Sequence, residues 1–184
     1  MNTSIDQDRK ELFHLLKTQA FSKGKFILSS GKESNFYLDV RLVTLSAAGA
    51  YLTARIMLDM IDKDQPDAIG GPTLGADPMV GAIASLSHQA GRPINTFIIR
   101  KQPKAHGKQQ QVEGPLLKEG GSVVIIDDVA TTGKAFVEAI EVLQKMNIKV
   151  KKAICVIDRD EGALEALAKY KVPLESIFTI RQFL

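Results

Sequence analysis

The sequence predicts an α/β protein whose core is an open, mainly parallel five-stranded sheet, flanked by helices and preceded by a small N-terminal hood. From residue 46 onward, short apolar runs alternate with segments of helical periodicity, which is the pattern of successive β-α-β units. The runs are apolar almost throughout, as strands covered on both faces are. A chain of 184 residues suffices for one domain with a full core, and we expect a single domain over 1–184.

Residues 1–45 are expected to form an N-terminal helix and the hood. The segment Asp6–Ala20 has apolar residues at helical spacing and acidic residues in its first turn, where the helix dipole favours them. Two short extended runs follow at 26–28 and 35–40, separated by residues that favour a turn. They predict a hairpin.

Residues 46–184 are expected to form the α/β core. Ser46 is suited to cap a helix that runs through Ile61. The periodicity then predicts strands at 67–70, 94–99, 122–127, 150–158 and 176–180, and helices at 78–89, 134–146 and 161–170.

Composition excludes several functional classes. The single cysteine, Cys155, excludes a disulfide framework and a multi-thiolate metal site, and its apolar neighbours indicate a core residue rather than a nucleophile. The polar first residues do not resemble a signal peptide, and no apolar stretch reaches the ~20 residues that span a bilayer, so we expect a cytoplasmic protein. The net charge of +3 is too small to indicate nucleic-acid binding.

The segment Val123–Ala135, VVIIDDVATTGKA, predicts a site for ribose 5-phosphate. An apolar strand ends in Asp127 and Asp128, and a turn rich in Thr and Gly opens a helix. Ligands of parallel sheets bind beyond the carboxyl ends of the strands, where the free N–H groups of 131–134 can converge on a phosphate. The two carboxylates would repel phosphate, but they would accept hydrogen bonds from vicinal ribose hydroxyls.

The alternative is that the two acids only end a strand and cap a helix. The sequence has neither the lysine-bearing phosphate loop nor the glycine-rich dinucleotide fingerprint. Its thirteen-residue segment resembles the signature with which type I phosphoribosyltransferases bind phosphoribosyl pyrophosphate (PRPP). The resemblance implies PRPP contacts from Asp127, Asp128, Val129, Ala130, Thr131, Thr132, Gly133, Lys134 and Ala135.

A second segment, Arg100–Gly114 (the basic loop), has four cations, one anion and no hydrophobic period. Polar loops of roughly 15 residues are uncommon in compact domains and are usually functional or disordered. A solvated loop is therefore the alternative to one that binds a compact anion such as pyrophosphate.

Three patterns are similar to those of orotate phosphoribosyltransferases. The basic loop contains R-K-x-x-K-x-H-G, matched by Arg100, Lys101, Lys104, His106 and Gly107. The hood matches F-x-L-x-S-G-x-x-S-x-x-Y-x-D-x-R over Phe26–Arg41, and an Asp-Arg pair, Asp158-Arg159, follows a later strand. Two departures stand out, because Ser29 and Gly75 occupy positions where many members have lysine. Pyrophosphate contacts would then fall more to Arg100, Lys101 and Lys104.

This resemblance implies transfer of ribose 5-phosphate from PRPP to orotate, a step of UMP biosynthesis. It implies catalytic roles for Lys104, His106, Asp127 and Asp128, further PRPP contacts from Arg100 and Lys101, and orotate contacts from Thr131, Arg159 and Tyr37. Mg²⁺ is expected as cofactor, held mainly through PRPP oxygens. The family also implies a homodimer in which one subunit's basic loop closes over the other's active site, with no nucleic-acid or membrane partner.

Three alternatives remain open at this stage. The chain could be a type I transferase for a purine base, or a regulator that senses PRPP without catalysis. Arg159 could also be no more than a surface residue paired with Asp160 or Glu161.

Overall fold

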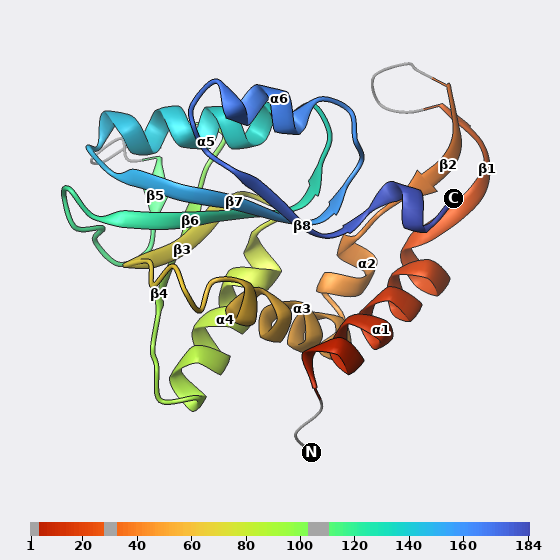
Figure 1. Ribbon diagram of the computed structural model, residues 1–184, viewed down its shortest axis with the longest axis horizontal. Coiled ribbons are helices and arrows are strands. Elements are labelled where there is room, and N and C mark those ends of the chain that lie inside the picture. The colour runs from red at the N-terminus through yellow and green to blue at the C-terminus, as the bar shows by residue number, and fades with distance from the viewer. Residues whose placement is uncertain (1–3, 28–32, 103–110) are drawn as a thin grey trace.

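The computed structural model describes residues 4–27, 33–102 and 111–184. Its centre is a six-stranded sheet in the order β5-β4-β3-β6-β7-β8 (Figure 1). The strands are β3 (Ala68–Pro72), β4 (Asn95–Ile99), β5 (Val112–Glu113), β6 (Ser122–Ala130), β7 (Lys149–Asp158) and β8 (Leu174–Thr179). Five of them are parallel, as predicted, and β5 pairs antiparallel with β4. The sixth strand comes from the end of the basic loop, which covers the free backbone groups at the β4 edge.

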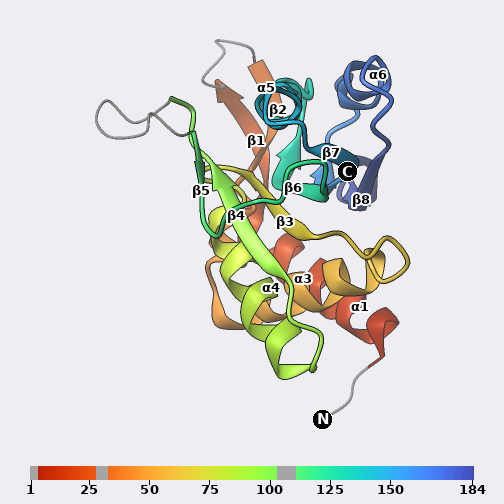
Figure 2. The same cartoon turned by 90° about the vertical axis from the view of Figure 1, so that its left-hand side faces the viewer.

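Helices cover both faces of this sheet (Figures 1 and 2). One face carries α5 and α6, and the other carries α1, α3 and α4. Their bounds are α1 (Ile5–Leu15), η1 (Leu16–Ala20), α2 (Arg41–Thr44), α3 (Ala47–Met60), α4 (Asp77–Gln89), α5 (Lys134–Lys145), α6 (Ala163–Ala168) and η2 (Ile180–Gln182). Ser46 caps α3 as predicted, because its Oγ accepts a hydrogen bond from the Gly49 N–H at 3.1 Å. No helix in the described part of the chain is long and apolar enough to cross a membrane.

Strand β6 shows why the layers hold together. Successive side chains of a strand point to opposite faces, so Val123 and Ile125 pack with the α5 side, while Val124 and Ile126 pack with the α3–α4 side. All four are at most 1% exposed, and full burial of one such side chain stabilises the fold by about 1.5–3 kcal/mol. The strand is therefore a rigid base for the residues that follow it. Cys155, on the neighbouring β7, is fully buried, which confirms its interpretation as a core residue.

The order of the strands contains one switch point, between β3 and β6. The chain runs from β3 through α4 to β4 on one side, and then returns to place β6 on the other side of β3. In open α/β sheets, ligands bind in the crevice outside the carboxyl ends of the strands at such a point. Here it brings the turn after β3, Thr73–Gly75, next to Asp127 and Asp128.

The hood is a separate antiparallel pair, β1 (Phe21–Ile27) and β2 (Glu33–Leu38). Phenylalanine rings join it to the N-terminal helix and the C-terminus: the ring centroid of Phe183 lies 4.7 Å from that of Phe13 and 5.8 Å from that of Phe21. Phe36 of β2 lies 5.7 Å from Phe21. This cluster orients β2 toward the end of β7, where Arg159 lies.

Several boundaries differ from those predicted. The first helix continues to Ala20 only through the π-helical η1, and the hood strand begins at Phe21, earlier than expected. The last helix spans Ala163–Ala168 and not 161–170, and it starts later because Gly162, just before it, adopts a left-handed conformation with φ of 103°. Strand β6 does not end at the acids but continues to Ala130, paired with β7 up to Asp158.

Candidate active site

Asp127 and Asp128 lie within the last part of β6, near the switch point. Only 7% of Asp127 is exposed. Its Oδ1 accepts a hydrogen bond from the Asp128 N–H at 2.9 Å, and Asp128 Oδ1 accepts one from the Val129 N–H at 2.8 Å. Each carboxylate is thus bound through one oxygen to the following peptide group, which restricts its orientation.

Burial shapes the electrostatics of this pair. It raises the pKa of Asp127, and the negative charge of Asp128 raises it further. Burial also raises the pKa of Asp128, although hydrogen bonds and the charge of Arg41 oppose that effect. Two neighbouring carboxylates in such a place resist simultaneous ionisation. A ligand that donates hydroxyl groups to them would relieve this cost.

The hood contributes a cation to the same region. Arg41 forms a bidentate ion pair with Asp39, in which Nε donates to Oδ1 at 2.9 Å and Nη2 donates to Oδ2 at 3.2 Å. The charge of Asp128 contributes to the raised pKa of Arg41. The hood and the acid pair are therefore electrostatically coupled, although more than eighty residues separate them in the sequence.

A cavity of about 560 Å³ opens beyond the carboxyl end of β6. The Thr-Thr-Gly turn forms one side of it, and α5 begins at Lys134 without a side-chain cap from any described residue. The N-cap, Gly133, has φ of 78°, and a Cβ there would lie 3.0 Å from the Ala163 Cα, so glycine is required. The cavity is lined by Lys101, Gln102, Asp127, Val129, Ala130, Thr131, Thr132, Gly133, Lys134, Ala135, Phe136 and Glu138.

A second cavity of about 230 Å³ adjoins the first and lies between the ends of β3 and β6. The two share four lining residues, namely Lys101, Asp127, Ala135 and Glu138. The second cavity is also lined by Asp128 and by the turn after β3, including Gly75. The two cavities therefore meet at Asp127, and Asp128 lines the second one.

Gly75 explains one departure from the family pattern. A Cβ at this position would lie 2.0 Å from Asp127 Oδ1 and 2.5 Å from Asp128 Oδ1. No side chain fits there while the acids keep their places, so the turn lies against the carboxylates as bare backbone. A lysine at this position would require a different arrangement of the turn.

Arg159 lies beside the start of the Thr131–Gly133 turn, at the end of β7. Its backbone N–H donates to the Ala130 carbonyl at 2.9 Å, and its side-chain Nε donates to Glu161 Oε1 at 2.7 Å. The guanidinium lies 5.1 Å from the ring centroid of Phe36, and 13% of the side chain is exposed. The ion pair with Glu161 exists, but the residue is mostly buried between the core and the hood. Asp160 pairs with Arg181 instead.

The other residues singled out by the sequence differ in position. Lys101 lines both cavities, whereas Arg100 lines the second one and pairs with Glu113 at 3.4 Å. Tyr37 follows Phe36 along β2, so the two side chains point to opposite faces of the hairpin and that of Tyr37 is on the exposed face. Its ring centroid lies 5.6 Å from that of Phe26. Lys104, His106 and Gly107, together with the hood residues Leu28, Ser29, Ser30 and Gly31, lie outside the described residues.

Sequence reasoning did not assign site roles to three features. These are the contact of Gly75 with the acids, the ring of Phe36 beneath Arg159, and Glu138, an acid that lines both cavities. The only local signal was the Gly-rich turn GGPTLGADP directly after a predicted strand. The other two features depend on contacts between distant segments.

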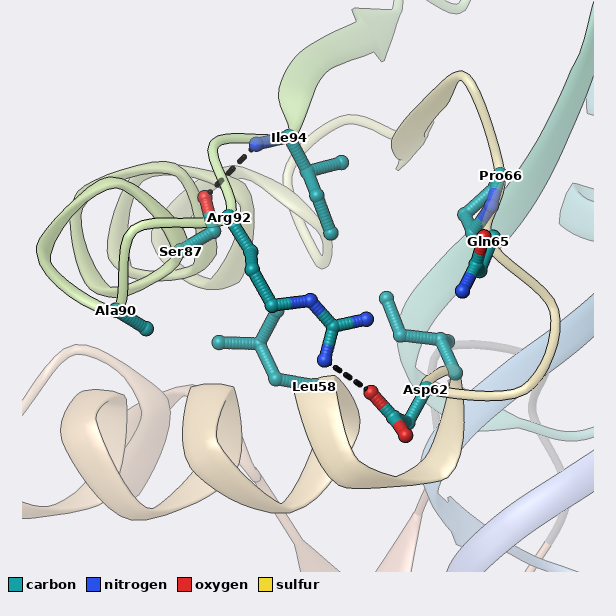
Figure 3. A pocket seen from close by; sticks show the side chains of 9 residues that line it. Leu58, Asp62, Gln65, Pro66, Ser87, Ala90, Arg92 and Ile94 are labelled. Carbon is teal, nitrogen blue, oxygen red and sulfur yellow. Dashed lines mark hydrogen bonds and ion pairs between the residues drawn. The ribbon is translucent and has the colours of Figure 1, made fainter.

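A further cavity lies away from this region, between α3 and α4 (Figure 3). It measures about 100 Å³ and is lined largely by apolar residues. Its charged pair is already formed, with Arg92 Nη1 at 2.5 Å from Asp62 Oδ1, and Ser87 Oγ accepts from the Ile94 N–H at 3.1 Å. The space is too small and too well paired to receive a sugar phosphate.

An acid pair, a Thr-Thr-Gly turn at a helix N-terminus and two adjoining cavities lie together at the switch point of the sheet, which is where α/β proteins bind their ligands. The model of the phosphoribosyl transferase domain matches residues 44–183. An orotate phosphoribosyltransferase of Synechocystis sp. is 41% identical over 176 residues, or 96% of this chain and 88% of the relative.

Solved structures agree with this finding. The orotate phosphoribosyltransferase of Mycobacterium tuberculosis H37Rv in complex with Fe(III) dicitrate has a TM-score of 0.85 at 35% identity, covering 96% of this chain and 98% of that one. The same enzyme in complex with PRPP has a TM-score of 0.80 at 31% identity, with the same coverage. The chain belongs to the phosphoribosyltransferase family, in the group of the orotate phosphoribosyltransferases. The family resemblance seen in the sequence motifs is thereby confirmed.

Proposed function

We propose that this protein transfers the phosphoribosyl group from PRPP to orotate and releases orotidine 5′-monophosphate and pyrophosphate. The observation that carries the proposal is the position of Asp127, which is buried and lines both joined cavities, with Asp128 next to it and the turn of Thr131–Gly133 on the wall of the first cavity. The relatives named above add the identity of the base.

The ribose 5-phosphate would lie across the end of β6. Its phosphate is received by the N–H groups and hydroxyls of the turn at 131–133 and the N-terminus of α5, where the helix dipole favours an anion. Its vicinal hydroxyls donate to Asp127 and Asp128, which stabilises the ionised form of both acids. The cavity volume of about 560 Å³ is within the range of small-molecule sites.

Orotate would lie between the hood and the end of β7. Arg159 can pair with its carboxylate, because a planar guanidinium matches a carboxylate with two parallel hydrogen bonds. The ring of Phe36 packs against that guanidinium. Thr131 lies on the adjoining cavity wall, and the part of Tyr37 would fall to its backbone, since its side chain points away. In this division the hood at 1–45 helps to bind the base, and the core at 46–184 holds PRPP.

Displacement at the anomeric carbon passes through a state with oxocarbenium character, as glycoside cleavage does. The protein therefore supplies positioning and charge rather than a covalent nucleophile. Arg100 and Lys101, together with Lys104 and His106, would stabilise the pyrophosphate as it leaves. Lys101 already lines both cavities.

Mg²⁺ fits this proposal as a cation carried by the substrate. Within the described residues there is no group of three or more His, Cys, Asp or Glu side chains that could hold a metal ion by themselves. PRPP provides the hard oxygen ligands that Mg²⁺ prefers. When bound, the ion would neutralise part of the charge on the pyrophosphate.

We also propose the homodimer with shared sites that the family implies. A long cationic loop beside the site would have to admit PRPP and then exclude water from the reaction. Mixing two inactive variants, one altered in the loop and one in the acid pair, tests which subunit's loop serves which site.

The experiment that tests the function is steady-state turnover with PRPP and Mg²⁺, supplying orotate, hypoxanthine or adenine in separate reactions. Orotate alone should be consumed, with pyrophosphate released in equal amount. Turnover of a purine base would favour a purine transferase, and PRPP binding without turnover of any base would favour a regulator.

A further inference from the structure

Asp77, the first residue of α4, makes a contact that the proposed reaction does not explain. Its Oδ2 accepts a hydrogen bond from Thr73 Oγ1 at 2.7 Å. Its other oxygen, Oδ1, is buried and has no hydrogen-bond partner among the described residues. A buried carboxylate oxygen without a partner costs free energy, and in native proteins such groups usually have a role beyond stability.

The bond from Thr73 to Asp77 closes the turn that lies against the acid pair. The backbone already ties this turn at three places: the Thr73 N–H donates to Ile99 O, the Ala76 N–H to Pro72 O, and the Asp77 N–H to Leu74 O. The side-chain bond joins the first residue of the turn to the first residue of the helix. Gly75, between them, is the residue whose backbone contacts both carboxylates.

The charge of Asp77 also acts on the site in an unfavourable direction. Burial and the charge of Asp128 raise the pKa of Asp127, and the charge of Asp77 adds to that increase. A third negative charge near the two acids destabilises the folded protein when no ligand is bound. Its presence is understandable if it places the turn correctly.

We propose that Asp77 is a positioning residue, which holds the Thr73–Gly75 turn against Asp127 and Asp128 through the Thr73 hydroxyl. The turn then forms a fixed wall behind the carboxylates and sets where they meet the ribose hydroxyls of PRPP. This inference rests on the proposed function. It concerns PRPP and not the base, because the turn lies against the two acids, whereas the Arg159 guanidinium packs on the Phe36 ring.

The test compares four variants of the turn. Asp77→Ala and Thr73→Val each remove the side-chain bond, whereas Asp77→Asn and Thr73→Ser retain an acceptor or a donor. A displacement of about 1 Å at a reacting group can reduce the rate by about 100-fold. We therefore expect the first two variants to lose about 10- to 100-fold in kcat/KM for PRPP, with little change in the KM for orotate, and the second two to retain most activity.

The melting temperature separates positioning from a structural role. Asp77→Ala removes a half-buried carboxylate that repels its neighbours, so its melting temperature should stay equal or rise while activity falls. A structural hydrogen bond would lower both together. The double variant Asp77→Ala with Thr73→Val should be no less active than the worse single variant, because both substitutions remove the same bond.

Thr53→Val is the matched control. Thr53 is a fully buried threonine of α3 whose hydroxyl has no partner among the described residues. The same substitution there should leave kcat/KM for PRPP unchanged. If Thr53→Val loses as much activity as Thr73→Val, the effect is general and the positioning role is wrong.

PRPP titration by calorimetry, in the presence of Mg²⁺, separates this inference from the proposed function. If the wild type turns over orotate and Asp77→Ala matches it in kcat/KM, only the positioning role is overturned. If the wild type binds PRPP but does not use orotate, the function is wrong, and the affinities of Asp77→Ala and Thr73→Val still decide the inference. If Asp77→Ala does not fold, the comparison of Thr73→Val with Thr73→Ser decides it.

Discussion

Substitution of Gly75 by alanine tests the packing of the turn against the acid pair. The added methyl carbon would lie 2.0 Å from Asp127 Oδ1 and 2.5 Å from Asp128 Oδ1, whereas an ordinary contact begins near 3.4 Å. The shorter contact therefore falls about 1.4 Å short, and interiors packed at crystal-like density give little room for relief. Either the turn or the carboxylates must move by roughly 1 Å.

That displacement can be converted into a rate. A misplacement of about 1 Å can cost about 100-fold, or about 2.7 kcal/mol of activation free energy at about 1.36 kcal/mol for each tenfold change. We expect kcat for orotate and PRPP to fall by this order in Gly75→Ala. The assay is initial-rate release of pyrophosphate at saturating orotate, with circular dichroism to verify that the fold is intact.

Gly81→Ala provides the control. Gly81 lies in α4, the helix that follows the turn, and a Cβ there would meet no atom within 4 Å. The same substitution should leave kcat unchanged and raise the free energy of unfolding by up to about 1 kcal/mol, since alanine favours the helix. Wild-type kcat in Gly75→Ala would refute the reasoning, because it would mean that the acids tolerate movement or do not act in the reaction.

Four further predictions concern the same site. Asp127→Asn with Asp128→Asn should abolish turnover and weaken PRPP binding with the circular dichroism spectrum retained; unchanged rate and affinity would exclude the acids from the site. Burial and the charge of Asp128 raise the pKa of Asp127 from 3.8 to about 8 in the folded protein. The folded protein therefore holds this proton more tightly than the unfolded chain does, and wild-type stability falls as the pH rises through the window from 3.8 to about 8. Asp127→Asn should therefore melt above the wild type at pH 7, and a difference that does not close as the pH falls toward 4 would contradict this cause. Arg159→Ala should raise the KM for orotate far more than that for PRPP, by about 10- to 150-fold for a charged hydrogen-bond pair worth about 1.5–3 kcal/mol, whereas equal effects on both would indicate a structural role. Equal mixing of inactive Lys104→Ala with the inactive double acid variant should restore roughly a quarter of wild-type activity if loops act across a two-fold interface, and none if each loop serves its own subunit.

Local patterns in the sequence were sufficient for the main elements of the core. Ser46 marks the start of α3 because a side-chain cap acts within one turn of the chain. The continuous apolar run before Asp127 marks β6, since a strand covered on both faces needs apolar residues at every position. These signals depend only on residues a few positions apart, so they can be read without the rest of the fold.

The same patterns placed some boundaries wrongly where pairing overrides local preference. The sequence predicts that β6 ends at its acids, yet backbone pairing with β7 continues as far as the pair of Ala130 and Asp158. The end of the basic loop read as irregular, but Val112 and Glu113 pair with the edge of β4. Each correction comes from a partner strand distant in the sequence.

The sequence by itself determined the class of fold and predicted a site at the segment that joins the acids to the Thr-Thr-Gly turn, because these residues are contiguous and their signals are local. Only the tertiary structure decided how Gly75 meets Asp127, where Phe36 supports Arg159, and that Asp77 closes the turn beside them. Those contacts join residues from separate loops at the switch point of the sheet. Their distances are set by how strands pair and helices pack, and no spacing along the chain encodes them.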